Sequence, residues 1–181
     1  MRGKRGVGEF AHIILRILLL FTAVCVLGNL GGCGNRREKA KQEVVELEKL
    51  FPLIEKHRVT SYHNLDWYQR LSYSKGFFTT TKDSRSALGH NDPQAFDDEA
   101  RAVFDSISKQ IDKIGVPISV INEVTFDPRG RLSGAKFHLE AGFIRVYDIY
   151  SPNYKTIPEN GFEQYYSPIN KDWYRLIEDW N

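Results

Sequence analysis

The stretch from residue 92 to residue 150 constrains the fold most, because a helical pattern in it is followed directly by strand patterns. Apolar residues between 96 and 114 fall within an arc of about 100° at 3.6 residues per turn, which predicts a core helix. We expect Asp92 to cap this helix, Pro93 to take its first position and Gly115 to end it. The expected buried face consists of Phe96, Ala100, Val103, Phe104, Ile107, Ile111 and Ile114.

Alternating apolar and polar residues after this helix predict a β-hairpin. Segments 118–126 and 135–139 alternate on either side of Asp127-Pro128-Arg129-Gly130, which has the proline and glycine of a tight turn. The alternation leaves one face of the hairpin wet. A third strand over 143–150 follows and is apolar on both faces.

The rest of the chain gives weaker patterns. Residues 37–57 predict a first helix with Val44, Leu47, Phe51 and Ile54 on one face, broken or kinked near Pro52. One or two strands are expected around 65–73 and 76–81. The segments 162–167 and 173–178 could pair across the turn at 170–172, or the second could form a short terminal helix.

Together these elements predict an α+β domain, with two helices packed on an antiparallel β-meander of four to six strands. Cystatin-like, NTF2-like and profilin-like arrangements all fit this pattern, and the residues do not choose among them. No internal repeat is visible in the sequence.

The amino terminus has the layout of a secretory signal. A positive segment containing Arg2, Lys4 and Arg5 precedes the apolar run 17–28. The run ends at Leu30-Gly31-Gly32-Cys33, which resembles the lipobox of bacterial lipoproteins. This resemblance implies that residues 1–32 are removed as a signal peptide and that Cys33 becomes the lipidated amino terminus. The alternative is an ordinary signal peptide or an uncleaved anchor in which Cys33 plays no part.

If the resemblance holds, residues 33–40 form a short membrane-proximal linker and residues 41–181 a single globular domain. The protein is then held on a bacterial cell membrane by lipid, with palmitate among the expected chains. Gly34 rather than Asp follows the cysteine, so in a Gram-negative cell the resemblance favours the inner leaflet of the outer membrane. Cys25 would be lost with the leader, which leaves Cys33 as the mature protein's cysteine and the domain without disulfides.

The charge of the mature chain argues against binding nucleic acid. The leader holds four of the 25 basic residues and one of the 23 acidic residues, which leaves 21 and 22. A nearly neutral domain creates no global field that would attract a polyanion. The expected partners are therefore the membrane, through the lipid on Cys33, and a protein of the cell envelope.

The mature sequence contains no His-Glu-x-x-His motif, no Gly-x-Ser-x-Gly motif and no glycine-rich phosphate-binding loop. We therefore expect neither a metal nor a cofactor nor catalytic residues. His138 alternates with Lys136 and Glu140 on the wet face of a predicted strand, and His90 lies in a predicted loop. An enzyme would have to bring scattered residues such as His90, Asp92, His138 and Glu140 into one cleft.

Aromatic residues are concentrated near the carboxyl end, with ten of them between residues 143 and 180. Core packing is the first interpretation of such a group. The second is a partner surface, because tyrosine and tryptophan suit surfaces that are apolar and still form hydrogen bonds. Its candidate residues are Tyr147, Tyr165, Tyr166, Trp173, Arg145 and Arg175.

These features lead to three ranked hypotheses. The first is a non-catalytic, lipid-anchored binding protein of the cell envelope, acting as an immunity-type inhibitor or as an accessory subunit. The second is a small-ligand carrier with an apolar pocket between sheet and helices. The third is an envelope enzyme.

Overall fold

The computed structural model describes residues 35–66, 68–80, 94–140 and 144–179. The chain divides into two compact units, Met1–Ala40 and Lys41–Asn181. The second unit contains the sheet and its helices and is described below. Cys33, His90, Asp92 and Pro93 lie outside the described residues.

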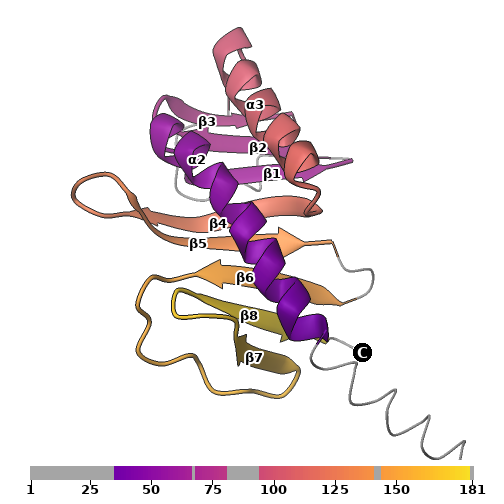
Figure 1. Cartoon of the computed structure of the whole chain (residues 1–181). Helices are drawn as coiled ribbons and strands as arrows, with labels where there is room; N and C mark the ends of the chain where they lie inside the picture. Colours follow the sequence, from indigo (N-terminus) through magenta and orange to yellow (C-terminus); the bar gives the residue numbers. More distant parts are fainter. Residues whose placement is uncertain (1–34, 67, 81–93, 141–143, 180–181) are drawn as a thin grey trace, which may run out of the picture. The chain divides into compact units, whose positions relative to one another are not determined.

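Eight strands form one antiparallel sheet in the order β3-β2-β1-β4-β5-β6-β8-β7 (Figure 1). The strands are β1 (Ser61–Leu65), β2 (Tyr68–Tyr73), β3 (Gly76–Thr79), β4 (Ile118–Phe126), β5 (Leu132–Leu139), β6 (Arg145–Tyr150), β7 (Gln164–Pro168) and β8 (Trp173–Glu178). The fold class is therefore α+β as predicted, but the sheet has more strands than the four to six expected. The excess arises because the segment between α2 and α3 contributes three strands and the carboxyl-terminal segments form a true hairpin.

From β3 to β6 the sheet consists of two similar halves. In each half a helix is followed by a three-stranded meander, and the first strand of each meander lies at the centre of the sheet. The first strands of the two halves, β1 and β4, pair antiparallel at the centre through Tyr62↔Ile121 and His63↔Val120. No internal repeat in the sequence predicts this arrangement. The β7–β8 hairpin extends the second half beyond β6.

The first helix includes residues 35–47 and passes through the 3-10 turn η1 (Glu48–Leu50) into α2 (Phe51–His57). The irregularity that was expected near Pro52 lies just before it, because Pro52 occupies one of the first positions of α2, where its missing N–H costs nothing. Arg58 ends α2 in the left-handed region, with φ +56°. The predicted face is buried at Val44, Leu47, Leu50 and Ile54, whereas Phe51 is only half-buried.

Helix α3 (Asp98–Ile114) begins later than the sequence predicted. Its N-cap is Asp97, whose side chain accepts a hydrogen bond from the Ala100 N–H at 2.7 Å. The segment before Asp97 is paired with β3 instead: the Gln94 N–H donates to the Phe77 carbonyl at 3.1 Å, and the Thr79 N–H donates to the Gln94 carbonyl at 2.9 Å. The helix therefore begins after this segment, at the next residue that can cap it. Gly115 ends the helix in the left-handed region as expected, with φ +67°.

The helices of the second unit lie on one face of the sheet, with α3 over β1–β3 and the first helix, from residue 41 on, crossing the other half (Figure 1). The core between them is filled by large side chains that are fully buried, among them Tyr62, Phe104, Phe137 and Trp173. Tyr62 also shares a hydrogen bond of 2.8 Å with Ser108 on α3.

Candidate functional site

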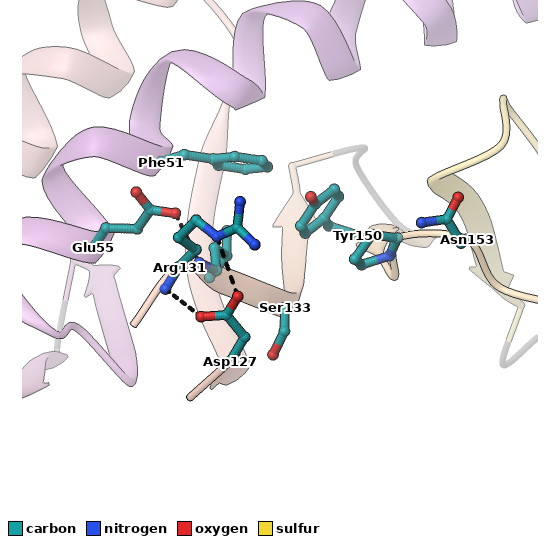
Figure 2. A pocket seen from close by; sticks show the side chains of 9 residues that line it. Phe51, Glu55, Asp127, Arg131, Ser133, Tyr150 and Asn153 are labelled. Atoms are coloured by element: carbon teal, nitrogen blue, oxygen red, sulfur yellow. Dashed lines mark hydrogen bonds and ion pairs between the residues drawn. The ribbon is translucent and has the colours of Figure 1, made fainter. Parts of the chain in front are cut away.

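A surface pocket of about 410 Å³ lies where three separate segments meet: α2, the turn between β4 and β5, and the end of β6 with the loop after it. Figure 2 shows Phe51 and Glu55 from α2 facing Asp127 and Arg131 of the turn, with Tyr150 and Asn153 beyond them. The pocket therefore depends on tertiary structure, since its residues are up to 102 positions apart in the chain.

Asp127 fixes the shape of the β4–β5 turn. Its Oδ1 accepts hydrogen bonds from the backbone N–H groups of Arg129 and Arg131, at 2.9 and 2.8 Å. Its Oδ2 is 3.1 Å from the Arg131 Nε. These contacts, the backbone bond from Arg131 first, lower the pKa of Asp127 below its usual value and keep the carboxylate charged.

Two side chains at the carboxyl end of α2 bind the backbone of the same turn. The Glu55 Oε1 accepts a hydrogen bond of 2.7 Å from the backbone N–H of Leu132. The Arg58 guanidinium donates to the Gly130 carbonyl and lies over the Phe126 ring, 5.1 Å from its centre. Because both contacts cross more than 70 residues of sequence, they position the turn with respect to the helix.

Aromatic rings form the opposite side of the pocket. Phe51 and Tyr150 pack with centroids 4.7 Å apart and planes tilted by 52°. Trp173 lies behind both rings, at 6.0 Å from Phe51 and 5.2 Å from Tyr150, and its indole N–H donates to the Glu48 Oε1 at 3.0 Å. Burial, and then the nearby carboxylates of Asp172, Glu48 and Glu55, raise the pKa of Tyr150, so its hydroxyl stays protonated and can donate.

Two residues of the predicted partner surface lie under the helices. Trp173 is completely buried, in contact with Phe51, Tyr150 and Phe137. Arg175 makes two hydrogen bonds to Asp148, at 2.7 and 2.8 Å, and a third to Glu43 of the first helix at 2.7 Å. These contacts use both side chains to join helix to sheet.

The other four residues of the predicted surface are divided between the two faces. Strand pairing places Arg145 opposite Glu178, and Tyr147 and Tyr166 both opposite Leu176, so these three side chains share the face away from the helices. Tyr165 pairs with Ile177 on the helix side, at the edge strand, and is 53% exposed. The structure therefore brings Arg145, Tyr147 and Tyr166 to one face and separates them from Trp173, Arg175 and Tyr165.

Of the residues that an enzyme would need, the described part of the chain includes His138 and Glu140. His138 stacks on Tyr147 with centroids 4.8 Å apart, and its pKa is lowered, chiefly by burial. Within the described ranges, no group of three or more metal-binding side chains comes together. No helix among these residues has the length and apolarity needed to cross a membrane.

The sequence singled out the turn at 127–130 and the helix face of Phe51, but it did not unite them into a pocket. Glu55, Arg131 and Asn153 were not predicted as site residues. The one available signal was the position of Arg131 directly after a tight turn, which by itself indicates no ligand.

Comparison of the chain with known proteins identifies no relative. No family model matches the chain, and neither a curated protein nor a solved structure is significantly similar to it. Any function must therefore be inferred from the residues of the chain itself.

Proposed function

We propose that this protein is a lipoprotein of the bacterial cell envelope, anchored by lipid on Cys33, whose domain acts as a non-catalytic binding or accessory protein. Leu30-Gly31-Gly32-Cys33, at the end of the apolar run, is the observation that carries the anchor. Two or more acyl chains give stable attachment, because each buried methylene contributes about 0.8 kcal/mol. The inner leaflet of the outer membrane is the expected site in a Gram-negative cell.

The described part of the chain begins directly after the proposed anchor. Residue 35 is already helical, two positions after the cysteine proposed to carry lipid. An anchor of this kind suits an accessory subunit or an immunity-type protein that meets its partner at the membrane.

The pocket supports binding rather than catalysis. The Asp127 and Glu55 carboxylates both accept hydrogen bonds from backbone N–H groups of the turn. Both carboxylates therefore hold the turn in place and so maintain the shape of the pocket. The small-ligand alternative is favoured by one specific observation, the pocket of about 410 Å³ itself. Its location at the surface fits a reversible binding site better than an enclosed carrier cavity.

Metabolic labelling with an alkynyl palmitate tests the anchor. We expect the native protein to be labelled and Cys33→Ser to be unlabelled. Cys25→Ser is the matched control, because it removes the other cysteine, which lies in the leader, and should leave labelling unchanged. A native protein without label, or a label that persists in Cys33→Ser, would contradict the proposed anchor.

Mild crosslinking in intact cells tests the binding role. A photo-reactive group at Tyr147, on the face away from the helices, should give a defined adduct with an envelope protein, and a group at Tyr165 on the helix side serves as the comparison. If neither position, nor a group placed at the pocket, gives an adduct with a protein or a small molecule, the binding proposal loses its support.

A further inference from the structure

We propose that the pocket between α2 and the β4–β5 turn, the pocket-turn site (Phe51, Glu55, Arg131, Tyr150 and Asn153), binds a neutral saccharide unit. The inference rests on the proposed binding function and names the ligand class. It is carried by the side chains that meet there and by the hydrogen-bonding capacity that they leave unused.

The site offers both donors and acceptors within a short distance. Arg131 uses its Nε on Asp127, and among the described residues no hydrogen bond involves its terminal guanidinium nitrogens; the side chain is 68% exposed. The Tyr150 hydroxyl and the Asn153 side-chain amide also form no hydrogen bond within the described part of the chain. Ser133 donates to Thr125 at 3.1 Å and retains its acceptor capacity.

The charges that line the site argue against an ionic ligand. A carboxylate or phosphate would approach Glu55 and Asp127, and an ammonium group would approach Arg131. An apolar ligand would cover these charged groups without replacing their water, which is unfavourable. A neutral molecule with several hydroxyl groups avoids both charge repulsion and the loss of hydrogen bonds, because hydroxyls donate to carboxylates and accept from a guanidinium.

The aromatic rings add the second requirement of a saccharide site. Phe51 and Tyr150 present half-buried ring surfaces, and one face of a pyranose ring is made of C–H groups that pack against such rings while its edges carry the hydroxyls. The volume of about 410 Å³ lies at the lower end of the roughly 300–1,000 Å³ usual for small-molecule sites. A pocket of this volume favours a ligand of one or two sugar rings.

Saturation-transfer NMR on the full-length protein tests this inference, in a detergent whose headgroup is not a sugar. The probes are glucose and N-acetylglucosamine, which are neutral, and glucosamine and glucuronate, which carry opposite charges at pH 6. We expect saturation of the C–H protons on one face of a neutral sugar and weaker binding of both charged probes. No transfer to either neutral sugar, or tighter binding of a charged one, would overturn the proposal.

Variants locate the binding. Arg131→Gln should weaken it by about tenfold or more, because a hydrogen bond from a charged donor is lost. Arg129→Gln is the matched control, since Arg129 lies in the same turn but does not line the pocket, and it should bind like the native protein. Asn153→Gly removes the side-chain amide while tolerating the left-handed φ of +57°, and should weaken binding even if Arg131→Gln fails to fold. Binding that survives in both folded variants would place the sugar elsewhere and overturn the assignment.

Failure of the saccharide assignment is distinguishable from failure of the proposed function. If palmitate labelling at Cys33 and crosslinking to an envelope protein both succeed while no sugar binds, the lipoprotein proposal stands and the saccharide assignment falls.

Discussion

Replacing Arg175 by methionine should destabilise the domain strongly, because it removes a cation that lies between two carboxylates. Arg175 bonds Asp148 twice and Glu43 once. The Asp148 side chain is completely buried, whereas those of Arg175 and Glu43 are 18% and 17% exposed. Methionine fills much of the space but leaves both carboxylates without this partner.

The expected loss is about 3 kcal/mol of unfolding free energy, near the lower end of the roughly 3–5 kcal/mol found when one partner of a buried ion pair is removed. The lower end applies because Arg175 and Glu43 keep some contact with water. A second substitution, Asp148→Leu, should restore most of the loss, since a buried ion pair can be replaced by apolar side chains at little cost.

The loss should also depend on pH. Burial raises the pKa of Asp148, and Arg175 opposes that rise, so removing Arg175 raises the pKa further. A carboxyl whose pKa is higher in the folded protein favours folding at low pH, and this contribution is lost as pH rises through the folded pKa. The deficit of Arg175→Met should therefore be largest at neutral pH and smaller near about pH 4.

Urea unfolding followed by circular dichroism measures the effect for the chain that starts at Gly34, as a change in midpoint at constant slope. Arg145→Met is the matched control, because Arg145 is exposed on the neighbouring strand β6, and it should change stability by less than about 0.5 kcal/mol. A loss below about 1 kcal/mol for Arg175→Met, or no recovery in the double variant, would refute the reasoning.

Individual contacts give three more predictions. Asp97→Ala removes the α3 cap and should cost about 1 kcal/mol by urea unfolding, whereas Asp98→Ala leaves the cap in place and should cost less. Gly130→Ala should cost about 1–2 kcal/mol, because φ is +81° and an L side chain is strained there; the Arg58 guanidinium, at the end of a flexible side chain, can move aside. A neutral result would contradict the turn geometry. Burial, and then Arg70, lower the pKa of His63 to about 4, so NMR titration should show a neutral ring at pH 6. The contribution of His63 to stability is complete above about pH 6.5 and should be lost as pH falls toward 4. A measured pKa near 6.5 would be inconsistent with that burial.

Local patterns predicted the parts of the fold that local forces decide. The apolar face of α3 from Ala100 to Ile114 and the hairpin around Asp127–Gly130 were both confirmed. Asp97 was overlooked as the cap because Asp92-Pro93 gives an equally good local signal. The choice between the two caps depends on the pairing of Gln94 with β3, a tertiary contact that the local sequence does not encode.

The site was harder to predict because its residues meet only after the chain folds. Phe51, Arg131 and Tyr150 lie on three elements, and each has an ordinary role in its own pattern: helix face, turn residue and strand residue. Trp173 and Arg175 have the composition of an interface, yet both occupy the space between sheet and helices. Residue type alone does not distinguish an aromatic core from an aromatic surface.

Membrane attachment through Cys33 is the central proposal, and the intact mass of the protein isolated from whole cells tests it most directly. We predict a chain that begins at Cys33, with residues 1–32 absent and added mass equal to that of acyl chains with their glyceryl link. A chain that retains its leader, or one that begins elsewhere with an unmodified Cys33 thiol, would contradict the claim.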